Sequence, residues 1–148
     1  LDNVRSLHNV GSVFRSCDAF RIEAVYLCGI TATPPSAEIH KTALGAEDSV
    51  SWKYYKSTLD AVEELKQKGY FVYSIEQVEG SENMAKISLD ASKRYAVVLG
   101  NEVKGVEQAV VNASDSCLEI PQLGTKHSLN VSVTAGIVVW EFAKQLAL

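Results

Sequence analysis

The sequence predicts an α/β domain with a mostly parallel sheet flanked by helices. Short apolar stretches alternate with longer stretches of helical periodicity along the whole chain. Stretches such as Ala24 to Cys28 and Tyr95 to Leu99 are almost continuously apolar, as strands buried on both faces of a parallel sheet are. The length of 148 residues suits one domain with one hydrophobic core, so we expect residues 1–148 to form a single domain.

The N-terminal half is expected to contain two helices and two strands. Asn9 to Arg21 is expected to be a helix, because apolar residues recur there at helical spacing. The buried strand at Ala24 to Cys28 follows, and a loop with Pro34-Pro35 leads to a short helical segment at Ala37 to Ala43. A second strand is expected at Val50 to Tyr55.

The C-terminal half continues the alternation. Ser57 is expected to cap a helix that runs to Lys68 and stops at Gly69. A long final helix is expected at Leu129 to Leu146; it is apolar on more than one face, so either the core or a partner subunit buries it. The remaining expected elements are strands at Phe71–Ile75, Tyr95–Leu99 and Cys117–Ile120, and a short helix at Glu107–Asn112.

Composition excludes several classes of protein. Lys and Arg number 14 against 18 Asp and Glu, and the net charge of -4 argues against a histone-like binder, although a local basic groove stays possible. Three cysteines without a Cys-x-x-Cys pair suggest neither a disulfide framework nor a zinc site, so we expect a reducing, cytoplasmic location. The most apolar stretch, Val131 to Trp140, is too short to span a membrane, and no signal peptide is visible.

The familiar nucleotide and hydrolase motifs are missing. There is no Gly-x-Gly-x-x-Gly, and Gly100 and Gly105 have P-loop spacing but precede Val106 and Glu107 rather than Lys and Ser or Thr. No Gly-x-Ser-x-Gly elbow is present. The three histidines are scattered and are expected to be exposed residues rather than metal ligands: His8, His40 and His127.

Ligands of parallel α/β sheets bind beyond the carboxyl ends of the strands, and three polar segments lie in or near the corresponding loops. In the first, Asn9 to Arg15, the residues Gly11, Arg15 and Asp18 share one flank of the helix. A structural alternative explains this segment by a surface Arg15–Asp18 ion pair and by Asn9 as the helix cap.

The second segment, Gly100 to Gly105, follows a buried strand. Its first glycine, Gly100, would let a ligand approach the backbone, and Glu102 follows at the ligand edge of the sheet. The alternative to a ligand-binding role is that this segment is an ordinary glycine-rich connection. The third segment places Ser128, Asn130 and Ser132 at the start of an apolar helix, after Ile120-Pro121. Capping explains one of these polar side chains but not Asn130 and Ser132 together.

Together the three segments resemble the motifs of the SpoU (TrmH) branch of the SPOUT RNA methyltransferases. The first is similar to N-x-G-x-x-x-R, the second to a strand ending in G-x-E-x-x-G, and the third to I-P followed by S-x-N-V-S. Their order and spacing agree from Asn3 to the C-terminus. The strand that precedes the first motif in the family survives only as Leu1 to Val4, and because the chain starts at Leu1 rather than Met, some N-terminal sequence is expected to be missing.

The resemblance implies an α/β fold with a deep C-terminal trefoil knot, formed by roughly Tyr95 to Val133. It implies methyl transfer from S-adenosylmethionine (SAM) to a ribose 2′-hydroxyl of tRNA or rRNA, by a homodimer with the site at its interface and without metal. Arg15 matches the catalytic arginine, Asn9 would position Arg15 or RNA, and Glu102 and Asn130 would orient the arginine and the ribose. Contacts to SAM are implied for Ile75, Leu99, Gly100, Ile120, Ser128 and Leu129.

Two other functions remain open on the sequence alone. A non-catalytic SAM- and RNA-binding dimer would keep the fold without the reaction; the presence of Arg15, Glu102 and Asn130 argues against it. A nucleotide-binding α/β module of another class lacks any phosphate-binding motif in this sequence.

Overall fold

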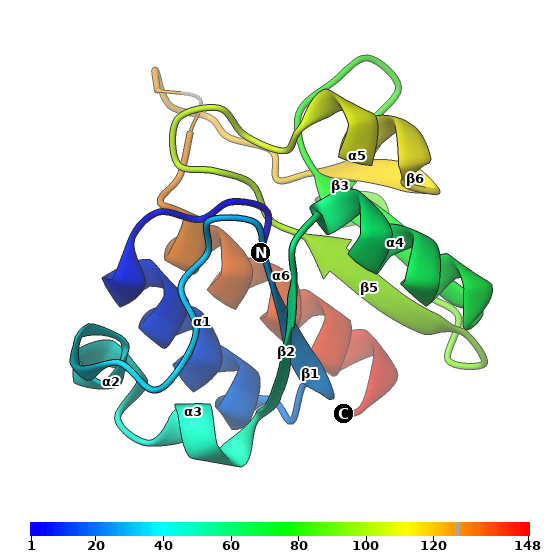
Figure 1. Ribbon diagram of the computed structural model, residues 1–148. Coiled ribbons are helices and arrows are strands. Elements are labelled where there is room, and N and C mark those ends of the chain that lie inside the picture. Colours follow the sequence, from blue (N-terminus) through cyan, green and yellow to red (C-terminus); the bar gives the residue numbers. More distant parts are fainter. Residues whose placement is uncertain (127) are drawn as a thin grey trace.

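The strands of the computed structural model (Figure 1) lie parallel to their neighbours, as the sequence predicts. The structure describes residues 1–126 and 128–148, so the expectation for His127 lies outside the described residues. β1 (Ala24–Cys28) pairs with β2 (Ser51–Tyr55) in a two-stranded sheet. A four-stranded sheet has the order β4-β6-β3-β5 and contains β3 (Tyr70–Ile75), β4 (Glu82–Asn83), β5 (Arg94–Val98) and β6 (Ser116–Glu119).

The expected helices are present; the one at Ala37–Ala43 has the expected ends, and the others are shifted at one or both ends. They are α1 (Leu7–Ala19), α2 (Ala37–Ala43), α4 (Thr58–Gln67), α5 (Gln108–Ala113) and α6 (Val131–Leu146). Three short elements were not expected from the sequence: α3 (Ala46–Ser49), β4 and a 3₁₀ turn at Met84–Lys86. Segments of two to four residues carry too little periodicity to be predicted.

The first turn of α1 differs from expectation. The helix begins at Leu7, and Ser6 is its cap: the Ser6 hydroxyl accepts a hydrogen bond from the backbone N–H of Asn9 at 3.1 Å. The structural alternative in which Asn9 caps this helix is therefore wrong. The side chain of Asn9 is left available for another partner.

Helices cover both faces of the four-stranded sheet. Val72 on β3 packs with Val62 of α4 and Val110 of α5, whereas the next residue, Tyr73, packs with Phe142 of α6. This alternation follows from the strand geometry, since successive side chains point to opposite faces.

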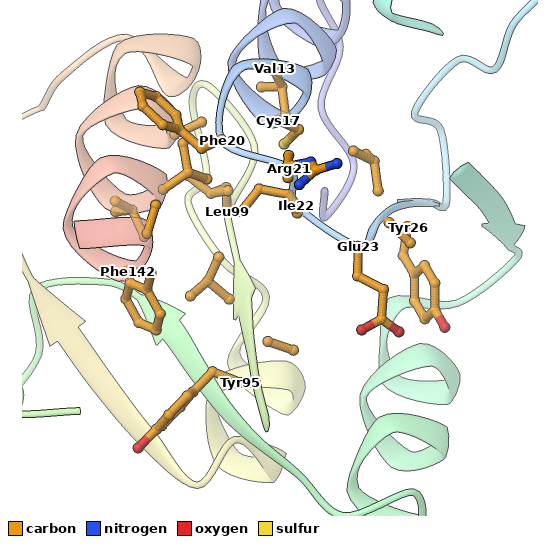
Figure 2. Close-up of a pocket in the computed structure, with 18 of the residues that line it drawn as sticks. Val13, Cys17, Phe20, Arg21, Ile22, Glu23, Tyr26, Tyr95, Leu99 and Phe142 are labelled. Carbon is orange, nitrogen blue, oxygen red and sulfur yellow. The ribbon is translucent and has the colours of Figure 1, made fainter. Parts of the chain in front are cut away.

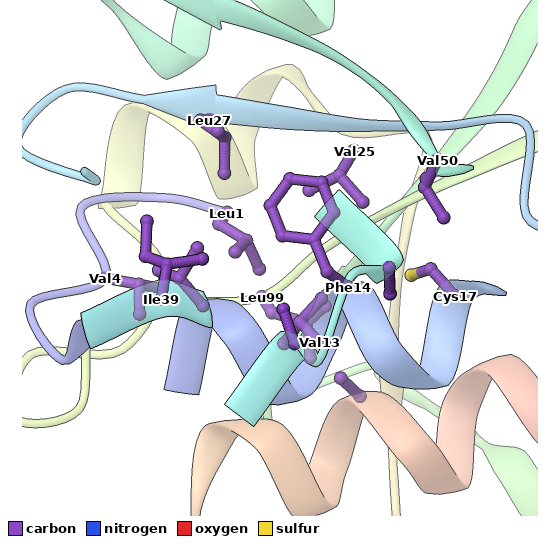
Figure 3. Packing of buried hydrophobic residues seen from close by; sticks show 14 of the residues in the cluster. Leu1, Val4, Val13, Phe14, Cys17, Val25, Leu27, Ile39, Val50 and Leu99 are labelled. Atoms are coloured by element: carbon purple, nitrogen blue, oxygen red, sulfur yellow. The ribbon is translucent and has the colours of Figure 1, made fainter. Parts of the chain in front are cut away.

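A second cluster surrounds α1. Figure 3 shows the buried ring of Phe14 among side chains from β1, including Val25, and from the segments around them. α1 also packs against α2 and α6, which places α1 and α6 side by side (Figure 1). This packing fixes the orientation of α1, which carries the first motif.

The strands form two sheets rather than the one expected, because only the segment Leu1 to Asn3 lies between β1 and β5. The N-terminal nitrogen of Leu1 donates to Tyr26 O of β1 at 2.7 Å, and Asp2 N donates to Leu99 O at 2.8 Å. Beyond this bridge, β1 and β5 enclose an apolar cavity of about 320 Å³. Figure 2 shows side chains from the end of α1, β1, β5 and α6 around it.

Candidate functional site

A second cavity, of about 370 Å³, lies at the carboxyl edge of the four-stranded sheet. It is formed by the residues that follow β3, β5 and β6 and by the segment leading into α6. We call it the carboxyl-edge cavity. All six residues implied as SAM contacts line it: Ile75, Leu99, Gly100, Ile120, Ser128 and Leu129. Glu102 and Asn130 line it as well.

The close approach at Gly100 is made by the chain itself. A Cβ atom built at Gly100 would lie 2.2 Å from the carbonyl carbon of Gly105 and 2.3 Å from Val106 N. Asn101 and Gly105 exchange backbone hydrogen bonds of 3.0 and 2.9 Å, so the loop folds back over its own start. Gly100 is therefore needed for this loop to close, which agrees with the alternative of an ordinary glycine-rich connection.

The turned loop presents Glu102 to the start of α1. Its Oε1 accepts from Arg5 N at 2.8 Å, and its Oε2 accepts from Ser6 N at 2.9 Å and from Asn9 Nδ2 at 3.2 Å. Partial burial raises the pKa of Glu102, but these backbone and side-chain hydrogen bonds outweigh it and hold the pKa below its ordinary value. The Asn9 and Glu102 side chains thus join the first two motifs.

Arg15 lies elsewhere on α1. It is six residues beyond Asn9, about 9 Å along the helix axis. Its exposed side chain lines a separate open depression, the Arg15 hollow, and has no hydrogen bond or ion pair with the described residues. The ion pair with Asp18, which the structural alternative requires, does not form. The hollow measures about 460 Å³ and is lined by Ser12, Arg15, Ser16, Ala19, Phe20, Lys41 and Thr42.

Gly11 of the first motif has a packing role. A Cβ atom at this position would lie 2.0 Å from Thr42 Oγ1 and 2.2 Å from Ile39 O. The glycine therefore lets α1 and α2 approach closely, and it is buried although Arg15 on the same flank is exposed.

Capping accounts for both polar residues at the start of α6, against expectation. Asn130 is the helix cap, and its Oδ1 accepts from Ser132 N at 2.8 Å, Ser132 Oγ at 2.6 Å and Val133 N at 3.3 Å. One amide oxygen thus serves three donors. The Nδ2 group of Asn130 makes no hydrogen bond with the described residues and remains available to a ligand.

Several residues that line the cavity were not among the predicted site residues, and Glu76 is one of them. Glu76 comes directly after β3, lines the carboxyl-edge cavity and accepts a hydrogen bond from Val106 N at 2.9 Å. Glu102 was selected because it lies in a loop beyond the carboxyl end of a buried strand, and the same signal applied to Glu76.

The described residues contain no cluster of three or more His, Cys, Asp or Glu side chains placed to bind a metal ion. His8 pairs instead with Glu38 at 2.9 Å, and His40 with Glu47 at 2.8 Å. Across the same residues, no helix has the length and apolar character needed to cross a membrane.

Comparison with known proteins identifies the family of this chain. The sequence model of the SpoU rRNA Methylase family matches residues 1–140. The chain belongs to the SpoU family. The SpoU assignment confirms the resemblance carried by the three motifs.

Curated SpoU relatives include enzymes acting on both kinds of RNA. The chain is 34% identical over 145 residues to a 23S rRNA (guanosine-2'-O-)-methyltransferase of Nitrosomonas europaea, covering 98% of this chain and 55% of that protein. It is 30% identical over 145 residues to a tRNA (guanosine(18)-2'-O)-methyltransferase of Thermus thermophilus, covering 98% of this chain and 73% of that protein.

Solved structures agree on the fold. A TrmH/SpoU tRNA modifying enzyme of A. aeolicus has a TM-score of 0.85 and 28% identity, over 97% of this chain and 72% of that one. An AdoMet-bound rRNA methyltransferase of Sinorhizobium meliloti has a TM-score of 0.89 and 28% identity, over 99% of this chain and 55% of that one. This chain of 148 residues thus spans little more than half the length of several relatives.

Proposed function

We propose that this protein transfers a methyl group from SAM to a ribose 2′-hydroxyl of tRNA or rRNA. The observation that carries the proposal is the carboxyl-edge cavity, because it gathers Gly100 and Glu102 of the second motif with Ser128 and Asn130 of the third. Glu102 also binds the first motif through Asn9. Relatives of both tRNA and rRNA specificity match this chain at similar identity, so both substrate classes belong to the proposal.

The cavity suits SAM in size and chemistry. Its volume of about 370 Å³ falls within the range of small-molecule sites, roughly 300–1,000 Å³. Ile75, Leu99, Ile120 and Leu129 supply aliphatic walls for an adenine ring, and the surrounding loops supply backbone donors and acceptors. When bound, SAM supplies an electrophilic methyl group on its sulfonium.

In the proposed reaction the ribose 2′-oxygen forms a bond to the methyl carbon as the bond from that carbon to sulfur breaks. The hydroxyl proton must leave as the oxygen attacks. A guanidinium is a poor base because it holds its proton very tightly, so Arg15 acts as an electrostatic partner of the oxygen and of the neighbouring phosphate. Proton acceptance then falls to solvent or to another group.

The proposed enzyme is a homodimer. Arg15 and the carboxyl-edge cavity lie in different depressions of one chain. α6 carries an exposed apolar stripe of Val133, Ile137 and Trp140, each between 36% and 50% exposed. The stripe reaches the Arg15 hollow, because the ring of Trp140 lies 5.6 Å from that of Phe20 between centroids. A second copy seated on this stripe would bring its cavity toward Arg15 and complete the site.

Four further features belong to the same proposal. Tyr95 to Val133 would form the trefoil knot of the family; residue 127 in this range lies outside the described residues. Asn9, Glu102 and Asn130 would position Arg15 and the ribose across the dimer. We place the enzyme in the cytoplasm, where RNA and SAM are both available, and assign it no metal.

We also propose that residues 1–148 form a single domain. Leu1 to Asn3 link β1 to the end of β5, because Leu1 N donates to Tyr26 O at 2.7 Å and Asp2 N donates to Leu99 O at 2.8 Å.

Nucleoside mass spectrometry tests the function. RNA from a strain lacking the gene should lack one 2′-O-methylated nucleoside, and the wild-type gene should restore it. The Arg15→Ala gene should fail to restore it. A complete set of 2′-O-methyl marks in the deletion strain would contradict the proposal.

A further inference from the structure

Glu76 occupies the middle of the carboxyl edge. It directly follows β3, the strand that lies between β5 and β6, and the ends of all three strands form the cavity. Glu76 N donates to Leu118 O of β6 at 3.1 Å, which holds its backbone in line with the sheet. The hydrogen bond therefore fixes the backbone position from which the Glu76 side chain extends, at the cavity that Ile75 and Gly100 also line.

One oxygen of the Glu76 carboxylate is already engaged. Its Oε2 accepts from Val106 N at 2.9 Å. The contact is close-packed, since a Cβ atom at Gly105 would lie 2.6 Å from the same oxygen, and Gly105 has a φ of 70°. Glu76 thereby fixes the end of the loop that carries Glu102.

The other oxygen, Oε1, has no hydrogen bond with the described residues, and no cation among them pairs with the carboxylate. A half-buried carboxylate with one oxygen anchored and one free is a preorganised acceptor. Hydroxyl groups of a ribose are donors that suit it, and acidic residues at strand ends bind ribose hydroxyls in other α/β folds.

We propose that Glu76 is a cofactor-binding residue whose Oε1 accepts a hydrogen bond from a ribose hydroxyl of the adenosine part of SAM. The inference rests on the proposed SAM site. Its competitor is a contact with the positive charge of the sulfonium or of the methionyl ammonium. The probe 5′-deoxy-5′-methylthioadenosine separates the two, since it keeps the ribose diol and carries neither charge.

Glu76→Gln is the informative variant. Its amide oxygen can still accept from Val106 N, so the loop keeps its anchor, but the free position becomes an NH₂ donor that cannot accept. Glu79→Gln is the matched control, because Glu79 is exposed three residues further on and does not line the cavity. Both variants lose one negative charge.

Calorimetry on the full-length protein measures the affinity for methylthioadenosine and for SAM. Glu76→Gln should bind each compound about tenfold or more weakly than wild type does. Glu79→Gln should bind both compounds as tightly as wild type. If folded Glu76→Gln binds methylthioadenosine as tightly as wild type does, the inference is overturned. If in that case only its affinity for SAM is weakened, the result favours the contact with a positive charge of SAM. If wild type binds neither compound, the proposed function fails first.

A measurement on wild type covers the case in which Glu76→Gln does not fold. The 2′-deoxy and the 3′-deoxy forms of methylthioadenosine are compared with the parent compound. The form that lacks the hydroxyl donating to Glu76 should bind about tenfold more weakly. Equal affinity for the parent compound and both deoxy forms would overturn the inference.

Discussion

Asn9 donates a hydrogen bond from its side-chain nitrogen to Oε2 of Glu102 at 3.2 Å, although 93 residues separate the two in the sequence. The same carboxylate receives the backbone N–H groups of Arg5 and Ser6, just ahead of α1. An anion at this end of a helix is favoured both by these donors and by the helix dipole. The loop beyond β5 and the start of α1 are thereby locked together.

Glu102→Gln should lower the free energy of unfolding by about 1 kcal/mol at pH 7, the scale of a lost helix cap. The folded-state pKa of Glu102 is depressed, so its contribution is present above the ordinary value near 4.5 and is lost as pH falls through the lower folded pKa. Urea unfolding from pH 7 to pH 3 should show the variant and wild type converging. A constant difference at every pH, or a similar effect of the exposed Glu63→Gln control, would contradict this role.

Gly11→Ala should destabilise the protein by about 1–3 kcal/mol, because the added methyl group collides with the Ile39 carbonyl and Thr42 and forces α1 and α2 apart. Gly136→Ala is the helical control: its methyl group would meet Ser16 Oγ at an ordinary 3.8 Å. Thermal unfolding of both variants measures the effect. A Gly11→Ala protein as stable as wild type would show that the helices are not closely packed at this point.

Arg15→Ala should reduce methyl transfer about 10²-fold or more and leave the affinity for SAM nearly unchanged. The reason is its position outside the carboxyl-edge cavity, combined with its proposed contact with the attacking oxygen. Arg15→Lys should recover little, since a single ammonium cannot make the two-pronged contact. Lys56→Ala serves as a control for a lost surface charge. A folded, dimeric Arg15→Ala protein with wild-type activity would remove the arginine from the mechanism.

Trp140→Asp should convert a dimer into a monomer. Light scattering of wild type should give about twice the 16.1 kDa mass of the chain, and the variant should give the monomer mass, because a charge in an apolar interface is costly. Trp52→Asp, on the exposed face of β2, should leave the dimer intact. Wild type that is monomeric at tens of micromolar would refute the composite site.

Much of the fold is predictable because local patterns control it. The apolar stripe of α1 and the apolar run of β1 are set by residues close in sequence, and the structure has both where expected. The strand ends also locate the ligand edge, which is why the residues implied as SAM contacts line one cavity. The order of the strands along the sheet depends on contacts between distant residues, so the hydrophobic periodicity of the sequence does not predict it.

The reasons for individual residues were harder to predict. Gly11 packs against α2 and Gly100 against its own loop, and neither contact leaves a local signal. At the start of α6 the error was one of chemistry, since a single Asn130 oxygen can accept three hydrogen bonds. The sequence also does not predict that Arg15 lies outside the carboxyl-edge cavity, because this depends on how the folded chain places α1.

The most direct test of the central claim follows the methyl group itself. The full-length protein is incubated with SAM carrying a labelled methyl group and with RNA from the deletion strain, and the RNA is digested to nucleosides for mass spectrometry. We predict label in a 2′-O-methylated nucleoside, on the ribose and not on the base. Labelled SAM that binds the protein without any label appearing on a ribose would contradict methyl transfer and leave a non-catalytic SAM-binding dimer.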